Sequence, residues 1–484
     1  MQKLVLIHGA IGSDQELVQI ADLLASDFEV INYAIPGHGS RSNERSQFQL
    51  KTIMADLESL LESIGEAYIF GFSMGGYIAM ALAQNHCPNI LGIVTLGTKL
   101  NWSKTVAERE IGMLNLTFLK EKAAGFYEYL RELHGQNLEQ LISPTAQLME
   151  ELGKAPLLTP TSVAQITIPV HCTRGGKDKM VTKAETKAIV DAMPNGRYFE
   201  IPNWIHPIGF LKPKAVAKHI KIQIAAMRNT YLDIKQHNIA IRKIGDWKSN
   251  QPTLVFLHEA LGSMAQWKSF PENLTQTLGL PGLLLEMPGY GFSSAVCEKR
   301  DNRYLHDFAW EILPAILEKL NLQQDLILVG HSDGGTEALL YAARYPHQVK
   351  AVITLAAHIK NEPETRAGIV PAISAYQAGK LQNLELYHGE KTEQLFYNWA
   401  NTWLSPDFKD WNITKDIQGT KIPALISQGD DDQYGTSAQV YEIVDCFGDF
   451  AQACFIPNCG HSPHISHEKE VLAEILAWWK TLHF

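Results

Sequence analysis

The chain has 484 residues, 45% of them hydrophobic and 19% charged, which is enough for two sizeable buried cores. Its net charge of −10 resides in residues 229–484, which hold 20 basic and 30 acidic residues. A nucleic-acid-binding protein is excluded because there is no basic stripe. No apolar run approaches bilayer length and neither end carries a lipidation motif, so we expect no membrane partner.

The first predicted element is a core strand. Residues 1–8 form a short apolar run that is too brief for the hydrophobic region of a signal peptide. This run leads directly into the motif His8-Gly-Ala-Ile-Gly12, and a second glycine-rich motif, Pro36-Gly-His-Gly39, follows. We therefore expect a cytoplasmic protein whose first residues belong to a folded core.

A sharp strand-to-helix turn is predicted around Ser73. Residues 66–70 are typical of a buried strand and residues 76–83 of a helix. Between them, Gly71-Phe-Ser-Met-Gly-Gly76 places glycines two positions before and after the serine, where the two backbones nearly touch. This pattern is typical of a nucleophile elbow; the alternative is a packing turn around an inert serine.

Later segments of the first half offer partners for this serine. Residues 168–173 are predicted as a strand, and Asp178 follows in the next loop. A second predicted strand, residues 197–201, leads to His206. The order Ser73, Asp178, His206 can supply a nucleophile, an orienting carboxylate and a general base.

The boundary between two domains is predicted near residue 228. A helical run over residues 212–227 ends the first half. Two alternating segments, residues 231–235 and 239–244, then suit an antiparallel pair. Because no Pro- or Gly-rich linker separates them, we expect domains at 1–228 and 229–484 that contact one another.

The second half repeats the same pattern. Gly330-His-Ser-Asp-Gly-Gly335 lies between a predicted strand and helix, and His258-Glu-Ala-Leu-Gly262 and Pro288-Gly-Tyr-Gly291 precede it. Predicted strands at residues 422–427 and 453–456 lead to Asp432 and His461. Aligning the glycines before the two acidic loops selects Asp432 over its neighbours Asp430 and Asp431. Paired landmarks lie about 250 to 260 residues apart and remain collinear, which indicates a duplicated domain.

Both halves resemble α/β-hydrolases, whose triads follow the chain order Ser, Asp or Glu, His. The resemblance implies an α/β fold with two tandem domains, each a mostly parallel twisted sheet flanked by helices. It also implies oxyanion donors at the backbone amides of Ala10 and Met74 in the first site, and of Ala260 and Asp333 in the second. The first half lacks the two leading strands usual in the family, so we expect its sheet to be smaller.

The resemblance further implies a helical cap over each nucleophile, at about residues 101–165 and 358–420. Both caps contain many aromatic residues, which we expect to form mainly the cap cores and partly an apolar substrate pocket. These aromatics are Trp102, Phe118, Phe126, Tyr127, Tyr129, Tyr376, Tyr387, Phe396, Tyr397, Trp399, Trp403 and Trp411.

Three positions depart from the usual pattern or add a charge to it. Glu259 stands where the family commonly has glycine, and we expect its side chain to point away from the oxyanion. Asp333 directly follows the second serine, where its carboxylate can cap the helix. Ile205 replaces the glycine that usually precedes the first histidine. These departures keep open a non-catalytic, ligand-binding role for one domain.

The function predicted from these residues is hydrolysis of carboxylic esters or thioesters of apolar or aromatic substrates through an acyl-enzyme. Alternatives within the resemblance are a C–C bond hydrolase and a menaquinone-pathway lyase, which would need Arg109 or Arg131 of the first cap for substrate carboxylates. Serine nucleophiles exclude the dehalogenases of this fold, which use aspartate. We expect a small-molecule substrate.

No cofactor and no metal are predicted. Although His461, His464 and His467 lie close together in the sequence, no matching carboxylate or cysteine set accompanies them. The six cysteines lack metal-site and disulfide spacing, so we expect reduced thiols. They are Cys87, Cys172, Cys297, Cys446, Cys454 and Cys459.

Overall fold

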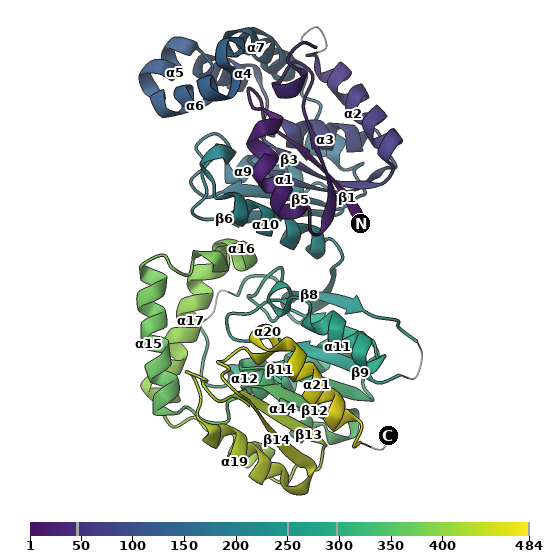
Figure 1. The fold of residues 1–484 in the computed structure, drawn as a ribbon, viewed down its shortest axis with the longest axis vertical. Coiled ribbons are helices and arrows are strands. Elements are labelled where there is room, and N and C mark those ends of the chain that lie inside the picture. Colours follow the sequence, from purple (N-terminus) through teal and green to yellow (C-terminus); the bar gives the residue numbers. More distant parts are fainter. Residues whose placement is uncertain (45–47, 249–250, 297–298, 483–484) are drawn as a thin grey trace. The chain divides into compact units, whose positions relative to one another are not determined.

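The chain divides between Met227 and Arg228 into two units, each built around its own sheet (Figure 1). The computed structural model describes residues 1–44, 48–248, 251–296 and 299–482. Cys297 lies outside the described residues, and the other five cysteines are buried and free. Among the helices of the described residues, none combines the length and apolarity that a bilayer crossing requires.

The first unit contains a six-stranded sheet in the order β2-β1-β3-β4-β5-β6, and every neighbouring pair is parallel. Parallel strands are covered by helices on both faces, which explains the nearly continuous apolar runs of the sequence. The strands are β1 (Gln2–Ile7), β2 (Phe28–Tyr33), β3 (Ala67–Phe72), β4 (Ile90–Leu96), β5 (Val170–Gly175) and β6 (Gly196–Ile201).

Alternate residues of these strands pack against different helices. Val5 and Ile7 of β1 share a core with helices that follow β2, β3 and β5. The helix that follows β1 (α1) contacts the last helix of the unit (α10). These helices are α1 (Val18–Leu24), α2 (Leu50–Ile64), α3 (Met74–Gln84), α9 (Lys183–Val190) and α10 (Pro213–Ala226).

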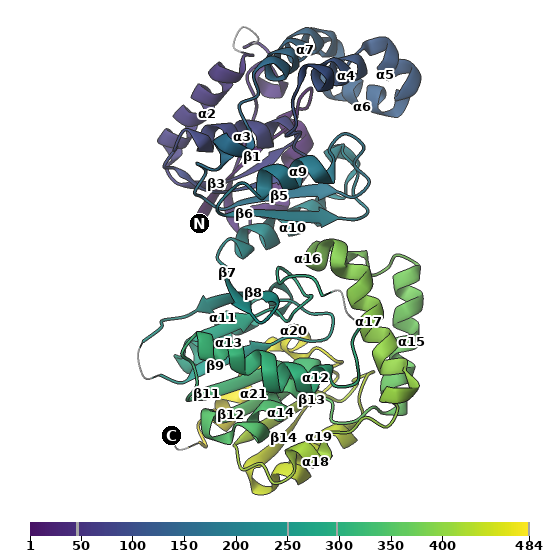
Figure 2. The same cartoon turned by 180° about the vertical axis from the view of Figure 1, so that it is seen from behind.

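Five helices are inserted between β4 and β5, as predicted for a cap. Figures 1 and 2 show its longer helices gathered together at one end of the unit. Their apolar residues form a separate small core that includes Ile11 of the loop after β1, so the insertion packs against that loop. The helices are α4 (Lys104–Met113), α5 (Leu116–Lys122), α6 (Ala124–His134), α7 (Leu138–Lys154) and α8 (Pro160–Val163).

The second unit contains an eight-stranded sheet in the order β14-β13-β12-β11-β9-β10-β8-β7. The predicted leading antiparallel pair is confirmed, since β7 pairs with β8 and β8 with β10 in antiparallel fashion, while the other pairs are parallel. The smaller sheet of the first unit is likewise confirmed. The strands are β7 (Thr230–Ile234), β8 (His237–Ile244), β9 (Thr253–Leu257), β10 (Gly282–Leu285), β11 (Leu326–His331), β12 (Val349–Leu355), β13 (Ala424–Gly429) and β14 (Ala451–Ile456).

The second cap lies between β12 and β13, and its long helices α15 and α17 stand beside one another (Figure 2). Phe396 of α17 is fully buried and stacks 4.1 Å from Tyr376 of α15, as expected of a cap-core residue. The cap helices are α15 (Pro363–Gln377), α16 (Glu385–His388), α17 (Thr392–Leu404) and α18 (Thr414–Ile417). The remaining helices are α11 (Phe270–Leu278), α12 (Tyr304–Asp307), α13 (Leu313–Lys319), α14 (Asp333–Arg344), α19 (Ser437–Phe447), α20 (Pro463–Ser466) and α21 (Glu468–Trp479).

Candidate active sites

Ser73 and Ser332 occupy matching sharp turns in the two units. Each serine follows a buried strand and precedes a buried helix, with φ and ψ of 51° and −113° at Ser73 and of 53° and −118° at Ser332. Positive φ is uncommon for a residue with a side chain and marks a strained turn. At Gly71 and Gly330, a Cβ atom would collide with the first turn of the following helix, which explains both glycines. Both predicted elbows are therefore formed.

The three predicted residues of the second site lie in one hydrogen-bonded chain. Nε2 of His461 is 3.0 Å from Oγ of Ser332, and its Nδ1 is 3.0 and 2.9 Å from the two carboxylate oxygens of Asp432. Within the described residues, neither Asp430 nor Asp431 contacts this imidazole. The serine hydroxyl thus has a base within proton-transfer distance, and the base has an orienting carboxylate.

Burial and pairing act in opposite directions on this imidazole. Burial disfavours the charged ring, but the hydrogen bond and charge of Asp432 outweigh burial and raise the pKa of His461 above its ordinary value. For Asp432, burial opposes the charged form, yet the bond to His461 holds its carboxyl pKa below the ordinary range. The carboxylate is therefore ionised at neutral pH and stabilises an imidazolium when one forms.

The first site brings together only two of its three residues. Nδ1 of His206 is 2.8 Å from Oδ2 of Asp178, and Oδ1 of Asp178 accepts the backbone N–H groups of Met180 and Val181 at 2.8 and 2.9 Å. No hydrogen bond joins Oγ of Ser73 to His206 in the part of the chain that the structure describes. The orienting half of this triad is in place, whereas the proton-transfer contact is not.

One backbone position beside the triads differs between the units. Gly97 follows β4 with φ of 62°, and a Cβ atom there would lie 3.2 Å from Nδ1 of His206. The matching residue after β12 is Ala356, which has a φ of 53° although it carries a methyl group. The match is fixed by shared hydrogen bonds, since both N–H groups donate to the next parallel strand, at Thr173 and Ser427.

The predicted oxyanion donors lie beside each serine. Ala10 and Met74 line one small cavity with Ser73, and Ala260 and Asp333 line another with Ser332. Among the described residues, no hydrogen bond uses the backbone N–H group of any of these four donors. Two free donors near each hydroxyl provide what a developing oxyanion requires.

A neutral histidine holds each oxyanion loop in shape. Nε2 of His8 accepts the N–H group of Ile35 at 3.1 Å, and Nε2 of His258 accepts that of Met287 at 3.1 Å. Their Nδ1–H groups then donate to the next carbonyl in the chain, at 2.9 and 2.8 Å. Burial lowers the pKa of each ring to about 4, so both stay neutral and keep an acceptor at Nε2.

The prediction that Glu259 points away from the second site is wrong. Glu259 lines the cavity with Ser332 and His461, and its carboxylate lies 3.8 Å from Nδ1 of His331. His331 directly precedes the nucleophile and donates from Nε2 to the carbonyl oxygen of His461 at 2.8 Å. Glu259 therefore points into the site, toward His331 and His461, a direction that the loop sequence does not reveal.

The expected helix-capping role of Asp333 is also wrong. Its carboxylate accepts the hydroxyl of Tyr304 at 2.6 Å, and that hydroxyl in turn accepts the indole N–H of Trp403 at 2.9 Å. Burial raises the pKa of Asp333 to about 6, although the charge of Arg300 opposes the shift. Tyr304 and Trp403 were missed because they lie in segments distant from the elbow in sequence.

The only candidate cation cluster in the described residues consists of Glu259, His331 and His461, whose ligand atoms lie within 4.8 Å of one another. Both ring nitrogens of His461 are already used by Ser332 and Asp432. His464 is buried, and the centre of its ring lies 4.7 Å from that of Trp267, so its place in the fold is explained by packing. This donor set fits a catalytic imidazole better than a resident metal.

Both serine cavities are small and enclosed partly by the caps. The Ser332 cavity measures about 80 Å³ and is lined by Ile369, Trp399 and Trp403 of the cap, among other residues. The Ser73 cavity measures about 40 Å³ and is lined by Lys99, whose ammonium pairs with buried Glu185 at 2.9 Å. Lys99 corresponds in position to His358 of the second unit, a buried ring whose pKa is lowered to about 3 by burial.

Comparisons with known proteins agree with this fold. A family described as alpha/beta hydrolase fold matches residues 252–412, and a family described as serine aminopeptidase, S33 matches residues 1–210. Cis-3-alkyl-4-alkyloxetan-2-one decarboxylase of Shewanella oneidensis is 26% identical over 209 residues, covering 33% of this chain and 66% of that protein. The chain thus spans slightly less than two thirds of this relative.

Two further proteins are similar to this chain. A 2-hydroxy-6-oxononadienedioate/2-hydroxy-6-oxononatrienedioate hydrolase of Paraburkholderia phymatum is 24% identical over 238 residues, covering 43% of this chain and 81% of that protein. The crystal structure of a membrane phospholipase A has a TM-score of 0.47 at 19% identity, covering 55% of this chain and 92% of that one. The chain belongs to the α/β-hydrolase superfamily and carries two hydrolase-fold units in tandem.

Proposed function

We propose that the second unit is a serine hydrolase that cleaves carboxylic esters or thioesters through an acyl-enzyme. The observation that carries the proposal is the continuous hydrogen-bonded chain from Ser332 through His461 to Asp432. A serine hydroxyl is a weak nucleophile unless a base accepts its proton, and this arrangement supplies that base.

The reaction proceeds in two matched halves. Oγ of Ser332 attacks the carbonyl carbon while Nε2 of His461 takes the hydroxyl proton, and the N–H groups of Ala260 and Asp333 stabilise the oxyanion. The imidazolium then gives its proton to the departing alcohol or thiol. Water repeats the sequence on the acyl-enzyme and releases a carboxylic acid, which restores Ser332.

The dimensions of the Ser332 cavity favour a short, apolar acyl group. Its volume of about 80 Å³ is small, and Ile369, Trp399 and Trp403 supply much of its apolar wall. Glu259 adds a carboxylate to the same cavity, so an acyl group with its own negative charge would be disfavoured.

Cleavage of a C–C bond is a second candidate. It is supported by the similarity to the Paraburkholderia protein, which is named as a 2-hydroxy-6-oxononadienedioate/2-hydroxy-6-oxononatrienedioate hydrolase. The lyase alternative has less support. Arg109 and Arg131 are each more than half exposed and pair with Glu110 and Glu128, and neither lines the Ser73 cavity. The carboxylate-binding arginines that this alternative needs are therefore not at the first site.

For the first unit we propose either a slower hydrolase site or a ligand-binding role, since Ser73 lacks the contact to His206. A fluorophosphonate probe followed by peptide mapping tests the two units together, because only an activated serine is modified. We expect labelling at Ser332 that exceeds labelling at Ser73. Hydrolysis of short-chain aryl esters by the full chain, without added metal or nucleotide, is the accompanying activity test. Unmodified Ser332 and no ester turnover would contradict the proposal.

A further inference from the structure

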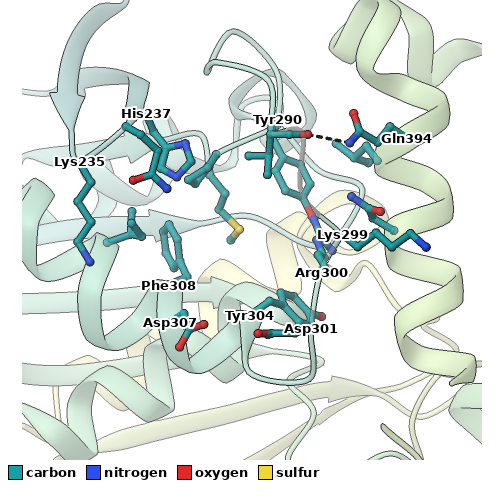
Figure 3. Close-up of a pocket in the computed structure, with 18 of the residues that line it drawn as sticks. Lys235, His237, Tyr290, Lys299, Arg300, Asp301, Tyr304, Asp307, Phe308 and Gln394 are labelled. Carbon is teal, nitrogen blue, oxygen red and sulfur yellow. Dashed lines mark hydrogen bonds between the residues drawn. The ribbon is translucent and has the colours of Figure 1, made fainter. Parts of the chain in front are cut away.

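A second, larger cavity of the second unit lies outside the Ser332 site. It measures about 470 Å³, within the usual range for small-molecule sites. Figure 3 shows side chains that converge on it from the β7–β8 turn, from the loop after β10, from the helical segment that begins at Tyr304, and from α17 of the cap. It therefore lies between the hydrolase core and the cap.

Arg300 is the central cation of this cavity (Figure 3). Its guanidinium carbon lies 5.1 Å from the ring centre of Tyr290 and 4.8 Å from that of Tyr304, and Nη2 donates to the Tyr290 hydroxyl. Its Nη1 atom is buried and has no hydrogen-bond partner within the described residues. A buried donor on a charged group is costly to leave unpaired, so this atom points to a missing acceptor.

Glu337 is a second unsatisfied group that lines the cavity. It lies on α14, its side chain is almost fully buried at 1% exposure, and Oε2 has no partner among the described residues. Burial raises the pKa of Glu337 well above its ordinary value, so the side chain is a neutral carboxylic acid that can donate a proton.

Most of the other charges around the cavity are already engaged. Nζ of Lys391 donates to the backbone carbonyls of Tyr290 and Gly291, and Lys235 pairs with Glu311 at 2.6 Å. Asp307 pairs with Arg303 at 3.5 Å. The unsatisfied buried atoms that remain are Nη1 of Arg300 and Oε2 of Glu337.

We propose that this cavity binds a small monocarboxylate with an apolar or aromatic body. The planar guanidinium of Arg300 matches a carboxylate, and the Glu337 carboxylic acid can donate to an oxygen of the same ligand. The body would lie against apolar residues of the wall, namely Met287, Phe308, Ile312 and Leu395. Carboxylates at Asp301, Asp307 and Glu311 disfavour a phosphate, which carries more negative charge.

The proposed site is distinct from the Ser332 cavity and does not require catalysis. The two cavities share no lining residue, and a hydrogen bond from Tyr304, in the wall of one, to Asp333, in the wall of the other, separates them. A carboxylate bound at Arg300 therefore lies behind the oxyanion side of the active site.

Calorimetric titration of the full chain with phenylacetate tests the proposal, with neutral phenylacetamide as the matched ligand. We expect saturable binding of phenylacetate and at least about tenfold weaker binding of the amide, because a charge-assisted bond is lost. Inorganic phosphate is not expected to displace phenylacetate. Equal affinity for acid and amide, displacement by phosphate at a similar concentration, or no saturable binding of phenylacetate would each overturn the proposal.

Matched variants place the binding at Arg300. Arg300→Gln should weaken phenylacetate binding at least about tenfold, whereas Arg344→Gln removes the same charge from an exposed residue outside the cavity wall and should bind as the unaltered protein does. If Arg300→Gln fails to fold in thermal melts, Arg300→Lys keeps the charge, loses the planar fork and should still bind several-fold more weakly. Unchanged affinity in a folded Arg300 variant would overturn the assignment.

Discussion

The two units share a nucleophile elbow, a carboxylate-oriented histidine and a helical cap, yet they differ at the contact between histidine and serine. His461 reaches Ser332 at 3.0 Å, whereas His206 is bound to Asp178 without a hydrogen bond to Ser73. The surrounding residues differ as well, since Lys99 and Glu185 form an ion pair where the second unit has His358 and Gln439. The two units therefore share the scaffold of the triad, while the walls around it differ.

The strongest test of this comparison removes each nucleophile. Ser332→Ala should lower kcat at the second site on the order of a million-fold, because nucleophile and base act as one unit. The rate that remains in this variant is that of Ser73, and we expect it to be the smaller part of the total. Ester turnover by the single variants and by the double variant measures both parts. Full activity in the double variant would exclude both serines.

Removing the orienting carboxylate compares the two histidines. Asp432→Asn should lower kcat at the second site about ten-thousand-fold, because the imidazole then adopts the wrong tautomer. Asp178→Asn should have a smaller effect on total turnover, since the Ser73 site contributes less. Steady-state kinetics with one aryl ester gives both values. A larger loss from Asp178→Asn than from Asp432→Asn would reverse the ranking of the sites.

The ion pair of the first unit is expected to matter for stability. Lys99→Met leaves Glu185 buried without its cation and should lower the free energy of unfolding of this unit by about 3 to 5 kcal/mol. The double variant Lys99→Met, Glu185→Gln removes both charges and should recover much of the loss. Denaturant unfolding followed by fluorescence compares them. Equal stability of the single and double variants would contradict this account.

The smallest expected effect concerns Glu259, which has Gly9 as its counterpart in the first unit. Its charge is one of the causes that raise the pKa of His461, after the stronger hydrogen bond to Asp432. Turnover needs the neutral imidazole, so activity is lost as pH falls through this raised pKa. Glu259→Gln should lower the pKa and move the acidic limb of the kcat/KM profile to lower pH. Movement to higher pH, or none, would show that Glu259 does not act on His461.

The scaffold and the positions of the six candidate triad residues were predictable because their constraints are local, but the missing contact between Ser73 and His206 was not. Gly71 and Gly330 are required where a strand and a helix nearly touch, and the acidic and histidine residues follow strands that end at one edge of a sheet. The antiparallel β7–β8 pair was equally visible in its alternating residues. The elbow glycines, the loops that follow the strands and the β7–β8 pair can each be recognised from the residues next to them in the sequence.

Features that depend on distant packing were not predictable. Glu259 points inward beside His331, a neighbour that the loop sequence does not identify, and in the first unit Phe72 stands in the place of His331. Asp333 bonds to Tyr304, which is 29 positions away, and the bond is completed by Trp403 of the cap. Asp333 and the first turn of α14 are buried, and the Tyr304 hydroxyl at 2.6 Å supplies the partner that its carboxylate needs there.

The φ that Gly97 and Ala356 share sets how closely the backbone can approach each histidine–carboxylate pair. An added Cβ atom at Gly97 would lie 3.2 Å from Nδ1 of His206 and 3.3 Å from Oδ2 of Asp178, which is closer than an ordinary contact. The second unit carries a methyl group at the matching place, at the cost of a positive φ for a residue with a side chain. A methyl group at position 97 would therefore require the His206 imidazole or its carboxylate to move by a few tenths of an ångström.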